Sequence, residues 1–249
     1  MITMEILKVE HVSKRFGENR VLEDIGLSLH KGELVSLLGV SGAGKTTLFN
    51  VISGLYTPED GRVLLNGENV TGKPGRISYM LQKDLLLPYR TVVDNVALPL
   101  IIKGTSKEEA RTRAGELFAQ FGLDGTQKKY PHQLSGGMRQ RAALLRTYLA
   151  SDGVALLDEP FSALDTITKS AMHDWYLEIM EEIDLSTIFI THDMDEAVKL
   201  SDRIYILSGK PGRITDEIVV DVPRPRPHDF DLTPEFLEYK RRIARSLIL

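Results

Sequence analysis

A glycine-rich segment between an apolar strand and a helix constrains the fold more than any other feature of this sequence. Residues 39–46 read Gly-Val-Ser-Gly-Ala-Gly-Lys-Thr and fit the pattern G-x-x-x-x-G-K-[ST]. Residues 33–38 before them form an apolar run typical of a buried strand, and residues 47–52 continue as a helix. Glycines allow the backbone to wrap around phosphate oxygens, and its N–H groups then form an anion-binding nest at the helix N-terminus. The segment predicts a P-loop within an α/β fold.

The side chains of this loop predict how a nucleoside triphosphate is held. Lys45 supplies a positive charge for the β- and γ-phosphates, and Thr46 supplies a hydroxyl ligand for Mg²⁺. The residues predicted to bind the nucleotide are Gly39, Ser41, Gly42, Ala43, Gly44, Lys45, Thr46 and Thr47. The alternative is a glycine-rich turn without a ligand, which the flanking strand and helix and the Lys-Thr pair disfavour.

Two adjacent carboxylates follow a second apolar run, residues 154–157. Asp158 ends a segment typical of a parallel strand and is predicted to reach the Mg²⁺ shell. Glu159, one residue beyond the strand, is predicted to polarise a water molecule for in-line attack on the γ-phosphate. Two acids at a strand end can also be surface charge or the start of a helix. The P-loop upstream favours the catalytic interpretation.

A third motif, Leu134-Ser135-Gly136-Gly137-Met138, precedes a predicted helix that contains residues 139–145. In this order and at these separations, the three motifs resemble those of the ATP-binding subunits of ATP-binding-cassette (ABC) transporters, and the resemblance covers nearly the whole chain. It implies an ATPase that uses ATP and Mg²⁺. The implied fold is the P-loop NTPase ABC cassette, an α/β fold with a RecA-like mixed sheet core, an antiparallel β subdomain and a helical insertion. The family signature usually ends in Gln, so Met138 is a departure, but the phosphate-facing donors Ser135, Gly136 and Gly137 are present.

Four further positions acquire roles through this resemblance. Gln82, after a predicted strand at 77–81, matches a glutamine that touches Mg²⁺ and the attacking water. Asp165 ends Ser162-Ala163-Leu164-Asp165, which resembles the family's D-loop at the dimer interface. His192, after the β-branched run 186–191, resembles the histidine that holds the γ-phosphate and orients the glutamate, and Phe16 matches the aromatic residue that stacks on adenine. Without the resemblance, Gln82 would be a solvent-facing strand end, His192 a structural histidine and Phe16 a core or edge-strand aromatic.

Length and composition exclude several other classes of protein. The 249 residues carry a net charge of −4, so no basic surface is expected to bind nucleic acid. Cysteine is absent, which rules out disulfides and thiolate metal sites. The N-terminus lacks the pattern of a signal peptide, and the longest central apolar stretch, residues 96–102, is too short to span a membrane. We therefore expect a peripheral protein at the cytoplasmic face of the cell membrane.

The order of the predicted elements gives one ABC ATPase domain, residues 1–249, with three parts. Residues 1–84 and 151–220 form the α/β core with its β subdomain, and residues 85–150 form the helical subdomain. Strands are expected at 6–12, 21–30, 33–38 and 62–66, and helices at 91–102 and 106–121. Residues 221–249 form a tail, in which the Pro-Arg alternation at 223–227 must be extended. Its end is expected to be a helix whose apolar face contains Phe236, Leu237, Ile243 and Leu247.

Finer features indicate which ABC proteins the chain resembles. The segment 85–96, Met138 and the Pro-Arg tail resemble ATPase subunits of importers for nitrate, sulfonate, taurine and related solutes. The resemblance implies integral membrane permease subunits, indirectly a solute-binding protein, and a second cassette subunit. The two cassettes would form a homodimer with ATP in which Ser135, Gly136, Gly137 and Asp165 act in trans. We expect Leu85–Asn95 to contact the permease; the alternative is that these residues only complete the helical core.

There are three alternative functions, of which the first is the hardest to exclude. An ATPase of an exporter or of a lipoprotein-release complex would carry the same motifs. A soluble ABC ATPase that acts on DNA or ribosomes is disfavoured by the acidic balance, the single cassette and the absence of long coiled-coil arms. A P-loop small-molecule kinase would have no use for the motif at 134–138.

Overall fold

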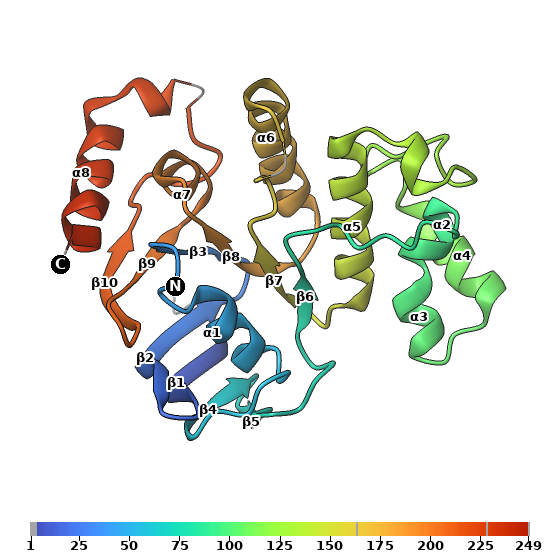
Figure 1. The fold of residues 1–249 in the computed structure, drawn as a ribbon. Coiled ribbons are helices and arrows are strands. Elements are labelled where there is room, and N and C mark those ends of the chain that lie inside the picture. Colours follow the sequence, from blue (N-terminus) through green and yellow to red (C-terminus); the bar gives the residue numbers. More distant parts are fainter. Residues whose placement is uncertain (1–3, 163, 228, 249) are drawn as a thin grey trace.

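A six-stranded, mostly parallel sheet forms the centre of the structure, a computed structural model that describes residues 4–162, 164–227 and 229–248 (Figure 1). The strand order is β10-β9-β3-β8-β7-β6, and only β10 runs antiparallel to its neighbour. Because parallel strands share the direction of their carboxyl ends, the loops after β3, β8, β7 and β6 meet at one edge of the sheet. The strands are β3 (Leu34–Gly39), β6 (Ser78–Met80), β7 (Val154–Asp158), β8 (Ser186–Thr191), β9 (Arg203–Ser208) and β10 (Arg213–Val219).

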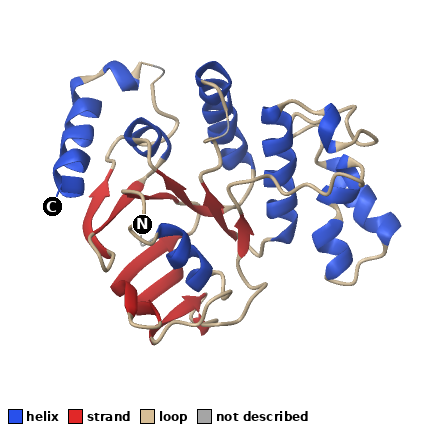
Figure 2. Cartoon of the chain, viewed as in Figure 1, coloured by secondary structure: helices blue, strands red, loops and turns tan. Residues whose placement is uncertain are grey.

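A second sheet, antiparallel and in the order β2-β1-β4-β5, packs with helix α1 (Lys45–Ile52) on one face of the first. Figure 2 shows α1 beside both sheets. One apolar cluster contains Leu7 of the second sheet, Phe49 of α1 and Leu37 of the first sheet, so all three elements share a core. The strands are β1 (Glu5–Phe16), β2 (Asn19–His30), β4 (Asp60–Leu65) and β5 (Glu68–Asn69).

Strand β3 is apolar almost throughout because both of its faces are buried. Val35 and Leu37 point into the cluster shared with α1, whereas Leu34 and Leu38 belong to clusters on the other face. Side chains alternate between the two faces of a strand, so a strand covered on both sides reads as a continuous apolar run. Helices α6 (Thr166–Glu182) and α7 (Met194–Leu200) contribute to the clusters on that other face.

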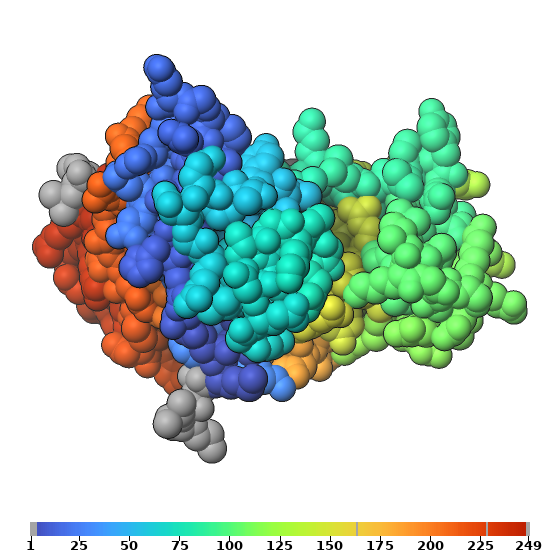
Figure 3. All heavy atoms as spheres, turned by 90° about the horizontal axis from the view of Figure 1, so that it is seen from below, coloured from blue at the N-terminus to red at the C-terminus, as the bar shows by residue number. Residues whose placement is uncertain are grey.

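The helical region contains α2 (Val92–Val96), α3 (Leu98–Ile102), α4 (Lys107–Glu116), a 3₁₀ turn at Pro131–Gln133 and α5 (Gly136–Ala150). Viewed from below, it forms a lobe at one side of the molecule (Figure 3, green). The prediction of one helix over 91–102 is wrong: the chain forms two short helices that meet at Ala97, because Pro99 supplies no backbone N–H to continue the first. The helix predicted over 106–121 ends at Glu116, directly after Gly115, a poor helix former.

The tail packs against the C-terminus of α7. Residues 221–227 contain no helix, as the Pro-Arg alternation predicts. The Arg226 guanidinium donates to the carbonyls of Val198, Lys199 and Ser201, at 3.0, 2.7 and 2.6 Å, and so satisfies acceptors at the C-terminus of α7. Desolvation by burial lowers the pKa of Arg226 to about 10, although four carbonyl acceptors, including Val222, favour its charged form.

Helix α8 (Pro234–Ile248) follows a 3₁₀ turn at Phe230–Leu232. Phe236 and Ile243 are buried and Leu247 packs against the same cluster, as predicted, but Leu237 is 47% exposed. The prediction for Leu237 is wrong because one residue turns a helix by about 100°, which carries Leu237 away from the face that contains Phe236. Among the helices of the described residues, none is long and apolar enough to cross a membrane.

Candidate functional site

The predicted P-loop connects the middle of the central sheet to α1. Strand β3 ends at Gly39, and α1 starts at Lys45 with Gly44 as its N-cap. A Cβ at Gly39 would lie 2.3 Å from the Leu207 carbonyl oxygen, so the strand pairing itself requires glycine there. Gly42 has a φ of 81° and open space around it, which leaves its backbone accessible to a ligand. Ser41 and Thr46 are exposed, whereas Ala43 is buried and can contribute only backbone groups.

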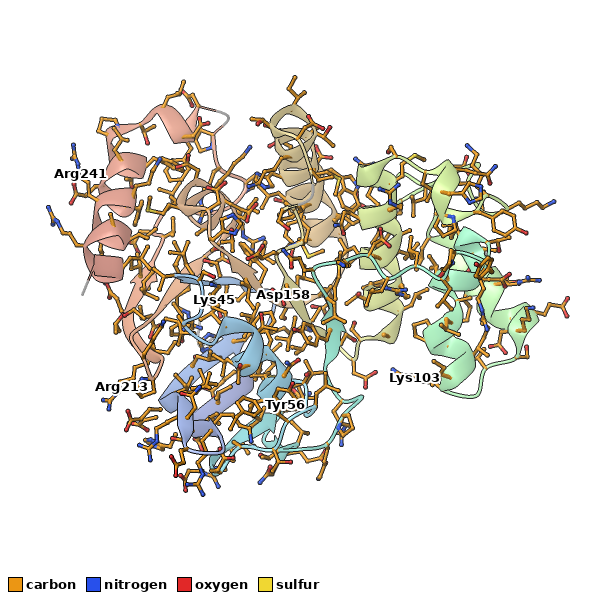
Figure 4. All side chains as sticks on the ribbon, in the orientation of Figure 1. Lys45, Tyr56, Lys103, Asp158, Arg213 and Arg241 are labelled. Atoms are coloured by element: carbon orange, nitrogen blue, oxygen red, sulfur yellow. The ribbon has the colours of Figure 1, made fainter. Side chains whose placement is uncertain are left out.

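Lys45 is folded back onto its own loop. Its ammonium donates to the carbonyl oxygens of Gly39 at 2.8 Å and Val40 at 3.1 Å. Burial lowers the pKa of Lys45, while the nearby carboxylates of Glu159 and Asp158 raise it. Figure 4 shows Lys45 close to Asp158. Within the part of the chain that the structure describes, this ammonium hydrogen-bonds to neutral carbonyls, so it has capacity for an anionic partner such as a phosphate.

Asp158, at the end of β7, is the buried carboxylate of the site, with 7% of its surface exposed. The hydroxyls of Thr46 and Tyr79 both donate to its Oδ2 atom, each at 3.3 Å. Burial raises the pKa of Asp158, and burial likewise raises the pKa of the Tyr79 phenol, which keeps it protonated as a donor. Sequence reasoning missed Tyr79. Only its place in strand β6, next to β7, brings it to Asp158, and no motif marks it.

Glu159 lies where the ends of three strands meet. Gln82, just beyond β6, donates from Nε2 to Glu159 Oε2 at 3.0 Å, and His192 Nδ1, just beyond β8, lies 3.2 Å from Glu159 Oε1. The φ of Glu159 is 47°, a conformation that costs energy for a residue with a side chain. Its backbone N–H donates to the Ile190 carbonyl at 3.1 Å, which holds it in this conformation. The structure thus brings together three residues that sequence analysis placed on three separate strand ends.

Oxygen ligands suited to Mg²⁺ are present, but they do not form a complete cage. Among the described residues, no group of three or more His, Cys, Asp or Glu side chains could hold a metal ion. The Thr46 hydroxyl and the Asp158 carboxylate share a hydrogen bond, and Gln82 comes from the neighbouring strand end. Mg²⁺ prefers oxygen ligands and is usually bound by one or two carboxylates together with substrate phosphates. The donor set therefore fits Mg²⁺ that arrives with a nucleotide.

Phe16, at the end of β1, is 47% exposed, so its ring is not part of the core. The Tyr56 ring meets it edge to face at a centroid distance of 5.5 Å, and the Lys14 ammonium lies 5.3 Å from its centre. These contacts hold the ring while leaving part of it free. A free aromatic face at a strand end can stack on a nucleobase.

The motif at 134–138 opens α5 and lies apart from the P-loop. Ser135 is exposed and caps α5 by accepting a hydrogen bond from the Met138 N–H at 3.3 Å, and Gly137 is buried against Met172 of α6. Figure 1 places α5 and α1 on opposite sides of β6 and β7. Asp165 caps α6, where its carboxylate accepts from Thr168; Ala163, in the same predicted loop, lies outside the described residues.

The predicted permease contact, Leu85–Asn95, is a loop that leads into α2 and is organised by one buried amide. The Asn95 side chain is fully buried, accepts from Leu87 N–H at 2.6 Å and donates to the carbonyls of Leu87, Arg90 and Thr91. Tyr89 is 94% exposed, and Leu85 and Leu87 are also exposed, whereas Leu86 is buried. The loop therefore presents three large apolar side chains to solvent, and Leu86 belongs to the core.

Comparisons with known proteins agree with these motifs. The sequence profile of the ABC transporter family matches residues 22–162. A formylaminopyrimidine import ATP-binding protein of Halalkalibacterium halodurans is 43% identical over 83% of this chain and 81% of its own length. An aliphatic sulfonates import ATP-binding protein of Bacillus cereus is 38% identical over 98% of this chain and 96% of its own length. A nitrate import ATP-binding protein of Synechococcus elongatus is 38% identical over 96% of this chain, which matches 39% of that longer protein.

The solved structure of a dimeric ATP-binding cassette in a post-hydrolysis state, bound to ADP and Pi, superposes with a TM-score of 0.72. It is 32% identical in sequence and covers 86% of this chain and 99% of its own. The family profile extends over more than half of the 249 residues, and the sulfonate relative matches nearly all of both chains. This chain therefore belongs to the ABC transporter family, as an ATP-binding cassette with ATPase activity.

Proposed function

We propose that this chain is the ATP-hydrolysing subunit of an ABC importer and works as an ATP-dependent dimer that drives a membrane permease. The observation that carries the proposal is the convergence of Lys45, Asp158, Glu159, Gln82 and His192 at one edge of the central sheet. They come from four element ends: Lys45 from the start of α1, Asp158 and Glu159 from the end of β7, Gln82 from beyond β6 and His192 from beyond β8. Together they supply a phosphate donor, a metal carboxylate and a held general base. We also propose that the described chain acts as one domain with the core, helical and tail parts predicted from the sequence.

In the proposed reaction, the P-loop backbone from Gly39 to Thr47 surrounds the phosphates, and Lys45 exchanges its two carbonyl partners for phosphate oxygens. Glu159 takes the proton of the attacking water, while Gln82 holds that water and His192 keeps the Glu159 carboxylate in place. Thr46, Asp158 and Gln82 would hold Mg²⁺, which when bound neutralises the charge of the β- and γ-phosphates. Phe16 would stack on the adenine ring.

A second subunit would complete the nucleotide site. The P-loop covers the phosphates from one side only, and the exposed Ser135 at the start of α5 offers further donors with Gly136 and Gly137. Because α5 lies apart from α1 within one chain, we propose that Ser135 and Asp165 act on the nucleotide of the partner in a head-to-tail homodimer.

Mixing two damaged chains tests the composite site. Lys45→Ala damages the P-loop, and Ser135→Arg damages the donor surface of α5. If the sites form between chains, the mixed dimer has one doubly damaged site and one intact site, and it should trap ATP that neither variant traps alone. If each site forms within one chain, every site in the mixture is damaged. The measurement is occluded ATP, and a mixture that traps no more ATP than its components contradicts the composite site.

The proposed membrane partner is a permease that binds the Leu85–Asn95 segment, so the chain would lie peripherally at the cytoplasmic face of the membrane. Exposed Leu85, Leu87 and Tyr89 support this contact. The relatives named for import of sulfonates, nitrate and formylaminopyrimidine favour import over export or lipoprotein release. We propose a small solute of the nitrate, sulfonate or taurine kind, delivered by a solute-binding protein, and no nucleic-acid partner. Uptake of labelled solutes by cells lacking this chain would test the choice.

A further inference from the structure

Two helices begin directly beside loops with predicted roles: the loop of Asp165, predicted to meet the partner's nucleotide, and the loop of His192, predicted to be catalytic. Helix α6 starts after Asp165, whose carboxylate accepts a hydrogen bond from Thr168 N–H at 3.1 Å. Helix α7 starts after Asp193, the residue that follows His192, and Asp193 Oδ1 accepts from the N–H groups of Asp195 and Glu196. Such a cap fixes the direction in which the chain enters a helix. A shift of the α6 N-terminus would therefore move Asp165, and a shift of the α7 N-terminus would move His192, the residue before its cap.

Lys169 connects the two caps. Its backbone N–H donates to the Asp165 carbonyl at 2.8 Å, as part of the first turn of α6. Its ammonium donates to Asp193 Oδ2 at 2.8 Å and lies 3.1 Å from Glu196 Oε1, both on the α7 side. One residue thus touches the Asp165 loop with its backbone and the His192 loop with its side chain.

These ion pairs are partly removed from water, so the loss of Lys169 would leave a buried carboxylate with one partner fewer. Glu196 is 4% exposed, and its second partner is His173 Nε2 at 3.0 Å; the Lys169 side chain is 22% exposed. Burial acts to lower the pKa of Lys169, but its bonds to Asp193 and Glu196 raise the pKa above the ordinary lysine value. Lys169 is therefore charged at neutral pH. Without the Lys169 ammonium, the Asp193 and Glu196 carboxylates would lose a shared cation, and their mutual repulsion would be less well compensated.

The apolar faces of the two helices pack largely into different clusters. Met172 and Tyr176 of α6 pack with the helical region, whereas Ala197 and Val198 of α7 pack with β9 and α8. The contacts of Lys169 with Asp193 and Glu196 are therefore a large part of the direct contact between the two N-termini. A comparable ion pair joins α7 to α6 away from the N-terminus of α7, where Lys199 donates to Asp174 Oδ1 at 2.8 Å.

We propose that Lys169 is a positioning residue that holds His192 against Glu159 and makes that contact respond to whatever binds the Asp165 loop. The inference rests on the proposed function, in which His192 steadies the general base and a second copy of the chain meets Asp165. Docking of the second copy would then be relayed through Lys169 to the base, and hydrolysis would follow dimer formation. Lys169 is not among the residues proposed to contact the nucleotide or the attacking water, so its proposed role is to position His192.

The test compares matched variants of the two ion pairs in the full-length chain. Lys169→Met should lower kcat about tenfold or more, the size of effect seen when groups that orient metal ligands are removed. The Kd for ATP should change by less than about twofold, because no ATP contact is lost. Lys169→Arg should restore kcat, since Arg keeps the charge and the donors. Lys199→Met removes an ion pair between the same helices and should leave kcat unchanged.

A double-mutant cycle separates positioning from simple destabilisation. If Lys169 acts through His192, then Lys169→Met should cost nothing further in a His192→Ala background, as measured by single-turnover phosphate release. Should Lys169→Met fail to fold, Asp193→Asn serves instead, because Asn caps a helix as well as Asp does but bonds Lys169 more weakly. It should lower kcat in the same direction by a smaller factor.

Unchanged kcat in Lys169→Met, an equal loss in Lys199→Met, or losses that add to those of His192→Ala would overturn the inference. These outcomes differ from failure of the proposed function. If His192→Ala and Glu159→Gln keep wild-type turnover, the catalytic assignment itself is wrong. If both lose turnover while Lys169→Met does not, only the role of Lys169 is wrong.

Discussion

Replacement of Glu159 by Gln tests the general-base assignment with little change in shape. Glu159 accepts from Gln82 Nε2 at 3.0 Å and faces His192 Nδ1 at 3.2 Å. A Gln side chain at position 159 can keep both contacts, because its carbonyl oxygen accepts from Gln82 and its amide can donate to the imidazole nitrogen in one tautomer. The substitution therefore removes the basic charge and leaves the packing in place.

The Glu159→Gln substitution is expected to slow ATP hydrolysis without weakening ATP binding. A positioned general base contributes about 10²–10⁴ in rate, so kcat should fall by that factor, which is about 3–5 kcal/mol of activation free energy. The Kd for ATP should stay within about threefold, because the phosphate contacts of Lys45 and the P-loop are intact. Single-turnover phosphate release measures the first quantity, and calorimetric ATP binding measures the second.

Two further variants sharpen the result. Glu181→Gln makes the same chemical change at an exposed position on α6 and should leave both quantities unchanged. Glu159→Asp keeps the charge but withdraws the carboxylate by one methylene from Gln82 and His192, so it should also hydrolyse slowly. Wild-type turnover in Glu159→Gln would refute the assignment of the base. Full activity in Glu159→Asp would refute the argument that the contacts with Gln82 and His192 matter.

The remaining predictions concern binding and stability. Lys45→Ala should weaken ATP binding by about 1.5–3 kcal/mol, because a charge-assisted phosphate contact exists in the ground state; an unchanged calorimetric Kd would contradict this. Phe16→Ala should cost about 1–3 kcal/mol for ATP and much less for inorganic triphosphate, and equal losses would mean a structural role. Tyr89→Asp should shift the free energy of unfolding by less than about 0.5 kcal/mol yet abolish co-purification with the permease, whereas Leu86→Asp should unfold the chain. Asp158→Asn should raise the Tm of the nucleotide-free chain at neutral pH, because burial raises the pKa of Asp158 and so penalises its charged form. This advantage should be absent below the unfolded-state pKa, grow as pH rises from there to the folded-state pKa, and stay constant above it; a Tm difference independent of pH would contradict it.

The sequence predicted the parts of the site that depend on local patterns. The P-loop, Asp158 with Glu159 and the strand before His192 are each visible within about ten residues, and parallel strands bring their ends to one edge of the sheet. The sequence did not predict contacts that depend on which strands are neighbours. Tyr79 reaches Asp158 because β6 pairs with β7, and Lys169 reaches Asp193 from another helix. Those contacts involve ordinary side chains whose partners are distant in the chain, so no spacing marks them.

The difference between local patterns and contacts distant in the chain also explains which predictions were wrong. The helix over 91–102 was predicted from apolar content, but the missing N–H of Pro99 splits it at Ala97. Asn95 looks like an ordinary helical residue in the sequence, yet its buried amide bonds four backbone groups of the preceding loop. A buried amide is retained only if its hydrogen bonds are satisfied. The buried Asn95 therefore sets the conformation of the exposed loop, and no pattern among the surface residues of the loop identifies it.

In the proposed nucleotide site, the burial of charged side chains lowers the stability of the free protein. Lys45 and Asp158 are both buried, yet the hydrogen bonds of Lys45 go to carbonyls and those of Asp158 come from hydroxyls. Burial therefore disfavours the charged form of each, which lowers the pKa of Lys45 and raises the pKa of Asp158. A nucleotide with its metal ion would give each group a partner of opposite charge, so the desolvation already present in the fold strengthens binding. The free energy that this desolvation costs is recovered when ATP binds, so ATP should raise the Tm by more than it would for a site of solvated charges.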